Sequence, residues 1–137
     1  MKKIEQIDIS GDVGLRIWGK SIEELFKNAA TGMFNLVTDT NKIKETEQKE
    51  VSLEADNHEN LLVQWLNELV FLYDTYGFIG KVFRISIQGN MLKATISGGI
   101  FDPGTNESRL LIKAATYHGL SLKKVALHWE ATVIFDI

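Results

Sequence analysis

The chain has 137 residues, 45% of them hydrophobic, with 15 basic and 18 acidic residues and no cysteine. This size predicts one domain over residues 1–137 with one buried core. The absence of cysteine excludes disulfides, thiolate metal sites and a cysteine nucleophile; it fits a reducing compartment, and we expect a cytoplasmic protein. Because no apolar run approaches about 18 residues and the lysines are scattered at a net charge of −3, we expect neither a membrane span nor strong direct binding of nucleic acid.

Two short strands are predicted near the N-terminus, over residues 4–9 and 13–18, with a turn at residues 10–12 between them. Gly14 weakens the second strand, because a glycine in a strand has no side chain to pack against its neighbours.

Two helices are predicted. The first begins at Ser21, where Ser21-Ile22-Glu23-Glu24 has the pattern of a capping box, and apolar residues recur at helical spacing as far as Val37. The second starts near Asp56 or Asn57, either of which can cap it, and Gly77 suits its C-terminal end.

Strands are also predicted between and after the helices. Residues 51–55 alternate in polarity and predict a strand, whereas the mixed charges of residues 42–50 are typical of a solvated connection. Residues 81–88 and 91–97 alternate with period two on either side of Gly89-Asn90, which predicts a hairpin.

Further strands are predicted in the last third of the chain. After a turn at residues 101–104, which holds the single proline, strands are predicted over residues 109–117, 121–127 and 129–136. Two helices in a strand-rich chain that ends in consecutive hairpins predict an α+β fold. In this fold two principal helices pack on mainly antiparallel β-sheet in a two-layer arrangement.

The three histidines share no short motif. His58 and His128 stand at predicted element ends, where single histidines are commonly solvated, so we expect both at the surface. His118, within Tyr117-His118-Gly119, is expected at the tip of a hairpin, where turn geometry alone could explain it. The chain lacks a phosphate-binding glycine loop, a nucleophile elbow and a zinc-binding helix, which weakens an enzyme interpretation.

Three carboxylates stand where predicted regular structure stops: Asp12 before a strand, Asp39 after the first helix and Asp136 as the penultimate residue. The terminal carboxylate of Ile137 is only about 3.3 Å of strand beyond Asp136, so two anionic groups meet there and repel each other unless a cation joins them. Oxygen ligands without cysteine favour calcium, magnesium or manganese over zinc. A turn cap at Asp12 and a solvated strand end at Asp136 remain simpler explanations.

Asp39 also has a competing explanation, since Thr38-Asp39-Thr40-Asn41 is the polar cluster expected after a helix. An acid at this helix end opposes the helix macrodipole, at a cost of roughly a few tenths of a kcal/mol, so we expect another interaction to favour it. Glu68 and Asp74 of the second helix are six residues apart, do not share a face, and are expected to be outward or interfacial.

Five segments of the chain, in order, resemble segments of the archease family. The first resembles the family's opening His-Thr-Ala-Asp-Val-Gly, and the others resemble its helix-end Met-Thr-Asp, its Trp-Leu-Asn-Glu-Leu helix, its Lys-Ala-x-Thr-Tyr-His-Gly segment and its Val-x-x-Asp-Ile ending. These segments are residues 11–19, 35–39, 62–69, 113–120 and 133–137. The chain is similar to the family over nearly its whole length.

The resemblance implies an accessory protein without catalytic activity of its own. Archeases are partners of the RtcB-type RNA ligase, whose guanylylation and multiple turnover they promote in tRNA splicing and RNA repair. The resemblance also implies a divalent metal site, with calcium the first expected ion and magnesium or manganese as alternatives. Its ligands would be Asp12, Asp136 and Ile137, and Asp39 would be close enough to contribute.

For activation of the partner, the resemblance points to Lys113, Asp39 and His118. The chain departs from the family at Ile9, which stands where the family usually has a histidine. Two other functions remain open: a chaperone-like modulator of an RNA-modifying enzyme such as a tRNA methyltransferase, and a metal-dependent hydrolase. The hydrolase is weakly supported, because no pair of nucleophile and base is recognisable. The sequence does not indicate an oligomeric state.

Overall fold

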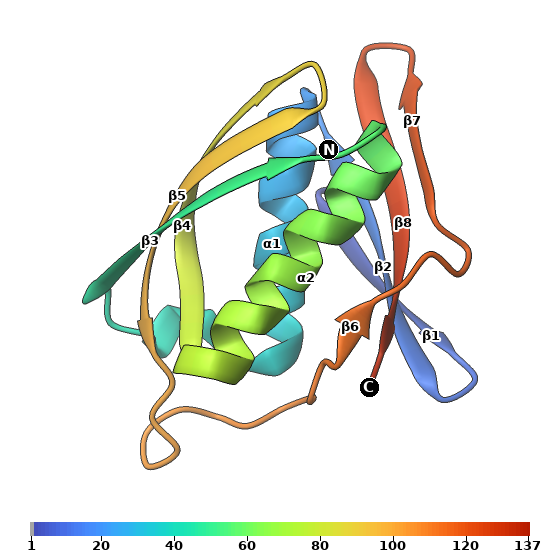
Figure 1. The fold of residues 1–137 in the computed structure, drawn as a ribbon. Helices are drawn as coiled ribbons and strands as arrows, with labels where there is room; N and C mark the ends of the chain where they lie inside the picture. Colours follow the sequence, from blue (N-terminus) through green and yellow to red (C-terminus); the bar gives the residue numbers. More distant parts are fainter. Residues whose placement is uncertain (1) are drawn as a thin grey trace.

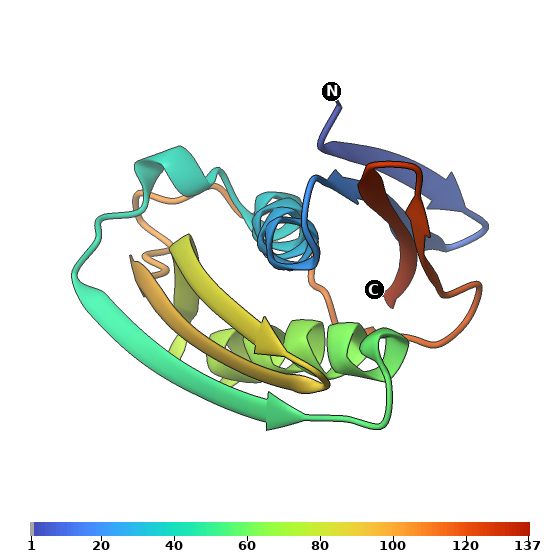
Figure 2. The ribbon, with the colours of Figure 1, turned by 90° about the horizontal axis from the view of Figure 1, so that it is seen from above.

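The computed structural model describes residues 2–137, in which two α-helices lie between two antiparallel β-sheets (Figure 1, Figure 2). The α+β class, with two principal helices packed on antiparallel sheet, is confirmed. In chain order the elements are β1 (Ile4–Ile9), β2 (Asp12–Gly19), α1 (Ile22–Val37), the 3-10 helix η1 (Thr40–Lys42), β3 (Glu47–Glu54), α2 (His58–Tyr76), β4 (Phe78–Gln88), β5 (Met91–Ile100), β6 (Ala114–Ala115), β7 (Ser121–Val125) and β8 (His128–Asp136).

The two sheets are joined by the helices. One sheet has the order β1-β2-β8, and both β6 and β7 pair with β8; the other has the order β3-β5-β4. α1 packs on β2 of the first sheet and on β4 of the second. The residues of β2 that face the helices, Val13, Leu15 and Ile17, are buried. The core therefore lies between the sheets, and each sheet turns its other face outward.

The predicted helix caps are confirmed. Ser21 Oγ accepts a hydrogen bond from the Glu24 amide at 3.1 Å, and Asn57 Oδ1 accepts one from the Asn60 amide at 2.8 Å. Each cap satisfies an amide that has no partner within its own helix. α2 ends at Gly77, whose φ of 70° is in the left-handed region that favours glycine.

Three strands extend three or more residues beyond their predicted bounds. β3 begins at Glu47, so the interpretation of residues 42–50 as a connection is wrong for residues 47–50, which form part of a charged edge strand. β4 begins at Phe78 and β5 ends at Ile100 because the two strands remain paired through glycines that carry no polarity pattern. A Cβ atom at Gly98 would overlap the Ile79 carbonyl oxygen, so only glycine fits this approach.

The strand predicted over residues 109–117 is wrong except for Ala114–Ala115. The backbone amides of Arg109 and Leu110 do not join a β-ladder. They donate instead to the carbonyls of Val37 and Leu36, each at 3.0 Å, at the C-terminal end of α1. The alternating polarity of residues 109–117 predicts a strand. It gives no sign that the acceptors of the Arg109 and Leu110 amides belong to the end of a helix far away in the sequence.

The hairpin predicted around His118 is also wrong. Ala114 is paired with Asp136, and Ser121 is paired with Thr132, so β6 and β7 run in the same direction along one edge of β8. Residues 116–120 therefore form a bulge between two strand segments and do not reverse the chain. We call them the 116–120 bulge.

The other two histidines are partly buried and have partners, which corrects their assignment as solvated surface residues. His58 Nε2 lies 2.8 Å from the Gly89 carbonyl oxygen, and its ring meets Trp129 edge-on. His128 Nε2 lies 3.3 Å from Glu130 Oε1. Glu68 is half-buried and Asp74 is exposed on α2. Within residues 2–137 no helix is long and apolar enough to cross a membrane.

Candidate functional site

The strand register brings Asp12 and Asp136 together from opposite ends of the chain. Val13 is paired with Phe135 in the ladder between β2 and β8. One further step in the same register places Asp12 opposite Asp136, and directly opposite residues of antiparallel strands point to the same face. Val13 and Phe135 are buried toward the helices, so the two aspartates are on the outward face of the sheet.

The same row of the sheet includes Ile9 and Ala114. Ile9 is the Cα partner of Asp12 in β1, and Ala114 is the Cα partner of Asp136 in β6. Four neighbouring strands thus contribute one outward residue each at this end of the molecule. The residue that departs from the family pattern, Ile9, is the direct neighbour of Asp12 across the strands.

The Asp12–Asp136 pair offers oxygen donors. Asp12 is half-buried, whereas Asp136 and Ile137 are exposed, and among residues 2–137 neither aspartate forms an ion pair. No group of three or more His, Asp or Glu side chains in this described part of the chain could hold a metal ion. An ion here would have two side-chain carboxylates and the main-chain oxygens of Ile137, a donor set that suits a hard cation.

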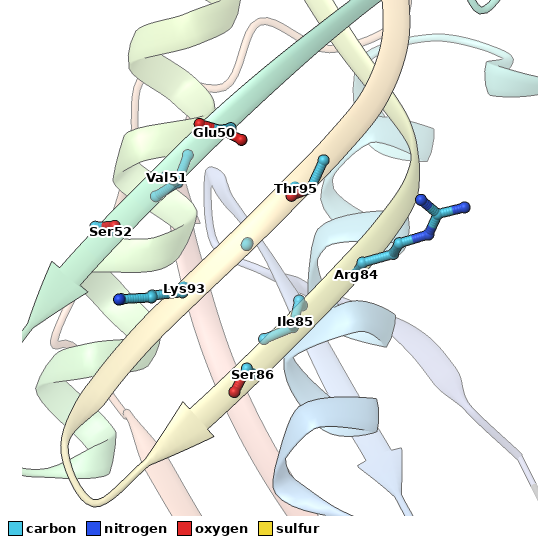
Figure 3. A pocket seen from close by; sticks show the side chains of 9 residues that line it. Glu50, Val51, Ser52, Arg84, Ile85, Ser86, Lys93 and Thr95 are labelled. Atoms are coloured by element: carbon cyan, nitrogen blue, oxygen red, sulfur yellow. The ribbon is translucent and has the colours of Figure 1, made fainter.

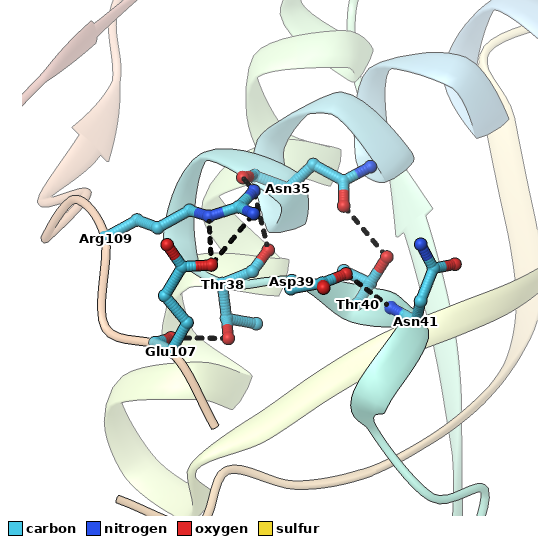
Figure 4. A network of polar contacts seen from close by, with 7 residues as sticks. All are labelled: Asn35, Thr38, Asp39, Thr40, Asn41, Glu107 and Arg109. Atoms are coloured by element: carbon cyan, nitrogen blue, oxygen red, sulfur yellow. Dashed lines mark hydrogen bonds and ion pairs between the residues drawn. The ribbon is translucent and has the colours of Figure 1, made fainter. Parts of the chain in front are cut away.

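Asp39 lies at the C-terminal end of α1 but belongs to no three-carboxylate group with the Asp12–Asp136 pair. Its Oδ1 accepts a hydrogen bond from the Asn41 amide at 3.1 Å and so caps η1 (Figure 4). This bond provides the interaction that was expected to favour an acid at a helix end. A second contribution comes from the positive charge of Arg109 beside the same helix end.

Arg109 caps the C-terminal end of α1 from far along the chain. Its Nη1 donates to the Asn35 carbonyl at 2.8 Å and to the Thr38 carbonyl at 3.5 Å, and its guanidinium pairs with Glu107 at 2.9 Å (Figure 4). α1 has no basic residue in its last turn, so Arg109 supplies the cation that helix C-termini favour. The sequence pattern missed this role, because nothing local links Arg109 to α1.

A buried threonine strengthens the same junction. Thr38 is fully buried, and its hydroxyl donates to the Glu107 carbonyl at 2.6 Å. Together with the amides of Arg109 and Leu110, this contact fastens residues 107–110 to the end of α1. The short segment between this junction and β6 is therefore fixed at both ends, by α1 at one end and by β8 at the other.

Lys113 and β6 lie against the end of β8. The Lys113 amide donates to the Asp136 carbonyl at 2.8 Å, and the Lys113 side chain is exposed. Asn67 of α2 exchanges two hydrogen bonds with the backbone of Ala115, at 3.1 and 2.8 Å. The sequence pattern does not assign this positioning role to Asn67, although a polar side chain within an apolar helix segment can indicate such a contact.

His118 is exposed in the 116–120 bulge, near the same outward face. The Thr116 amide and hydroxyl each donate to the Ile134 carbonyl at 2.9 Å. A Cβ atom at Gly119 would lie 3.7 Å from Ile134 Cγ1, so the bulge lies over Ile134. Ile134 and Asp136 are on the same face of β8, which places the bulge one step along this face from Asp136.

A cavity of about 540 Å³ lies on the outward face of the other sheet and contains none of the predicted site residues (Figure 3). Its lining includes the cationic side chains of Arg84 and Lys93 and the hydroxyls of Ser52, Ser86 and Thr95. Arg84 and Lys93 are on the same face but extend toward opposite edges of the sheet (Figure 3), so they do not meet over one ligand. The Asp12–Asp136 end is the stronger candidate site.

Comparison with known proteins gives a consistent result. The sequence profile of the Archease protein family matches residues 5–137. The protein archease of Saccharolobus islandicus is 39% identical over 139 residues, which cover 100% of both chains. The solution structure of Methanobacterium thermoautotrophicum protein 1598 matches with a TM-score of 0.88 at 33% identity, over 100% of both chains. The crystal structure of an archease and possible chaperone from Thermotoga maritima matches with a TM-score of 0.70 at 27% identity, over 97% of this chain and 96% of that chain.

Proposed function

Because the chain belongs to the archease family, we propose that it is an accessory protein that activates an RtcB-type RNA ligase. It promotes guanylylation and multiple turnover of that enzyme and has no catalytic activity of its own. The observation that supports this proposal is the placement of Asp12 opposite Asp136 at an exposed end of the molecule. That arrangement offers a cation site to a partner but contains no nucleophile and base.

The proposal includes a divalent ion at this end. Asp12, Asp136 and the oxygen atoms of Ile137 would hold it, with calcium the first expected ion and magnesium or manganese as alternatives. Carboxylates on directly opposite residues repel each other, and the repulsion is stronger where solvent is excluded. The absence of an ion pair on either aspartate among residues 2–137 leaves that repulsion for a bound cation to offset.

The site residues would act on the ligase by entering or abutting its active site. Divalent cations neutralise the charge that develops on a triphosphate during nucleotidyl transfer. Asp12 and Asp136 would position such a charge at the entrance of the ligase site. Lys113 and His118, which lie beside this end, and Asp39, at the C-terminal end of α1, would contact the ligase or its nucleotide.

A reconstituted guanylylation assay tests the proposal. The ligase is incubated with GTP alone, with this protein, or with its Asp136→Asn variant, which keeps the side-chain volume and removes the charge. We expect the variant to lose about tenfold or more of the stimulation, which corresponds to about 1.4 kcal/mol. Glu54→Gln removes a charge from the exposed edge strand β3 and should stimulate normally. Undiminished stimulation by Asp136→Asn would contradict the proposal.

A chaperone-like modulator of an RNA-modifying enzyme, such as a tRNA methyltransferase, is the second candidate function. It is favoured by the similarity to the Thermotoga maritima protein, whose structure carries the description of a possible chaperone. Suppression of the methyltransferase's aggregation, undiminished by replacement of both Asp12 and Asp136 with asparagine, would support this function over ligase activation.

A further inference from the structure

The strand β3 leaves one edge of its sheet open. It is an end strand in the order β3-β5-β4, whereas β4, at the other end, packs against α1 and η1. Figure 2 shows β3 as the outermost strand of this sheet, on the same side of the molecule as α2. An open edge presents backbone amides and carbonyls that can pair with a further strand.

The register identifies the backbone groups that face this edge. The Ala55 amide donates to the Asn90 carbonyl at 3.2 Å. Because hydrogen-bonded positions alternate along an antiparallel pair, every second residue of β3 turns its amide and carbonyl away from β5. These residues are Gln48, Glu50, Ser52 and Glu54. Among residues 2–137, no backbone hydrogen bond from outside the sheet reaches these groups.

Two exposed aromatic side chains of α2 lie beside the inner face of β3. Phe71 and Tyr76 are each 52% exposed, and their rings meet edge-on at a centroid distance of 6.4 Å. We call these two residues the aromatic pair. Lys49 of β3 reaches it, with Nζ 4.4 Å from the centroid of the Tyr76 ring. Exposed apolar side chains that gather in one region commonly mark a surface that another molecule covers.

The outer face of the same edge is acidic. Val51 is buried toward the helices, so Glu50, Ser52 and Glu54, which alternate with the inward residues, point outward. Both glutamates are exposed, and neither forms an ion pair among residues 2–137. A strand added at this edge would have one row of side chains beside two carboxylates and the other row toward the aromatic pair.

From these observations we propose that β3 and the aromatic pair bind an extended segment of a protein partner, which joins the sheet as a fourth, antiparallel strand. The segment alternates cationic and apolar residues. Its cationic side chains face Glu50 and Glu54, and its apolar side chains cover Phe71 and Tyr76. In such strand addition the backbone hydrogen bonds supply affinity and the alternate side chains supply specificity.

This surface is separate from the Asp12–Asp136 pair, which belongs to the other sheet. The proposal therefore goes beyond ligase activation and does not depend on it. It gives the protein a second interaction surface, and that surface recognises a partner by main-chain pairing.

The charges at the edge favour this segment over other occupants. A second copy that paired through its own β3 would bring two more glutamates to the outer face, where four carboxylates would then gather. A nucleic acid would bring phosphates to the same carboxylates and be repelled. Charged edge strands also resist indiscriminate pairing, so a partner strand must carry compensating cations.

The experiment uses three synthetic peptides of 8 residues, the length of β3, as probes. The first alternates lysine and valine, and the second alternates glutamate and valine. The third repeats the first with every lysine amide N-methylated, because residues opposite Glu50 and Ser52 would direct their amides at β3. Binding and amide hydrogen exchange of the whole protein are followed by nuclear magnetic resonance.

The lysine–valine peptide should bind and slow hydrogen exchange of the Glu50, Ser52 and Glu54 amides by about tenfold or more. The glutamate–valine peptide and the N-methylated peptide should each bind about tenfold or more weakly. Equal affinity for all three peptides, or binding that leaves these amides unprotected, would overturn the proposal. So would the absence of binding by the lysine–valine peptide.

Two double variants test the two faces of the edge. Glu50→Lys, Glu54→Lys should reverse the preference, so that the glutamate–valine peptide binds more tightly than the lysine–valine peptide. Phe71→Ser, Tyr76→Ser should weaken binding of the lysine–valine peptide about tenfold. Unchanged preference in the first variant and unchanged affinity in the second would each contradict the proposed contacts.

The other sheet provides a matched control. Tyr117 is 59% exposed in the 116–120 bulge, and Leu127 is 90% exposed in the β7–β8 turn. The Tyr117→Ser, Leu127→Ser variant removes similar exposed apolar surface and should bind the lysine–valine peptide as the wild type does. Circular dichroism checks the fold of every variant; if the aromatic double variant is unfolded, Phe71→Ser alone takes its place.

Self-association gives a different result. A wild-type dimer in sedimentation, whose formation protects the Glu50 and Ser52 amides without any peptide, would assign the edge to a second copy and overturn the proposal. None of these outcomes bears on ligase activation, which is decided by the guanylylation assay with Asp136→Asn.

Discussion

Asn67 exchanges two hydrogen bonds with Ala115: its Nδ2 donates to the Ala115 carbonyl at 3.1 Å, and its Oδ1 accepts from the Ala115 amide at 2.8 Å. These bonds join α2 to β6 across 48 residues of sequence. Since Ala114 is in turn the partner of Asp136, one amide side chain in the middle of α2 sets the position of the segment that flanks the candidate site.

Asn67→Asp should destabilise the protein. The new carboxylate can still accept from the Ala115 amide, but its other oxygen faces the Ala115 carbonyl and repels it. We expect a loss of about 2 to 3 kcal/mol in the free energy of unfolding, measured by urea denaturation. Gln64→Ala, at an exposed position of the same helix, should change stability by no more than about 0.5 kcal/mol. Equal effects of the two substitutions would show that the Asn67 contacts contribute nothing.

Arg109→Ala should weaken the C-terminal end of α1. The substitution removes the hydrogen bonds to the Asn35 and Thr38 carbonyls and the positive charge at the helix end. Because 38% of the Arg109 side chain is exposed, solvent screens the charge and we expect a loss of only about 1 kcal/mol, measured by urea denaturation. Arg109→Lys should retain part of the stability, since an ammonium keeps the charge and loses the forked geometry. Arg84→Ala, on the outward face of the other sheet, is the control and should be neutral.

Tyr73 should make stability fall at alkaline pH. Partial burial, and secondarily the negative charge of Asp74, raise the pKa of the Tyr73 hydroxyl above its ordinary value of 10.0. The folded state thus holds this proton more tightly than the unfolded state does. The corresponding stability is fully present below about pH 10 and is lost as pH rises through the folded pKa. In urea titrations above that pH, Tyr73→Phe should lose stability less steeply than the wild type; parallel slopes would contradict this assignment.

Ile9→His restores the residue that the resemblance leads us to expect beside Asp12. The register places position 9 directly opposite Asp12, so the carboxylates should favour the charged imidazole and raise its pKa above about 6.5. Nuclear magnetic resonance titration of the ring measures this value. Addition of calcium should lower it, if the ion binds to the Asp12–Asp136 pair. If the imidazole pKa is below the ordinary value and does not change with calcium, neither the carboxylates nor the ion lies next to position 9.

The candidate site was only partly predictable. The sequence places Asp12, Asp39 and Asp136 at the ends of predicted regular elements, and the family resemblance implies a metal site that includes Asp12 and Asp136. The structure separates Asp39 from a three-carboxylate group and ties it to Asn41. It also adds Arg109, Thr38 and Asn67, whose partners are backbone groups far along the chain. Such contacts leave no periodic signal, because a backbone carbonyl places no constraint on the residue type that carries it.

Local chemistry was sufficient for both helices, their caps and the Gly89-Asn90 hairpin, since capping, amphipathic spacing and turn preferences act over a few residues. It failed for residues 109–117. Their alternation predicts a strand, but the amides of Arg109 and Leu110 donate to the end of α1, and β6 is limited to Ala114–Ala115. The pairing of Asp12 with Asp136 likewise depends on the β2–β8 register, a contact between the two ends of the chain. Only the tertiary structure decides such long-range pairings. Backbone donors and acceptors that are buried when the core forms must find partners, and those partners can be far away in the sequence.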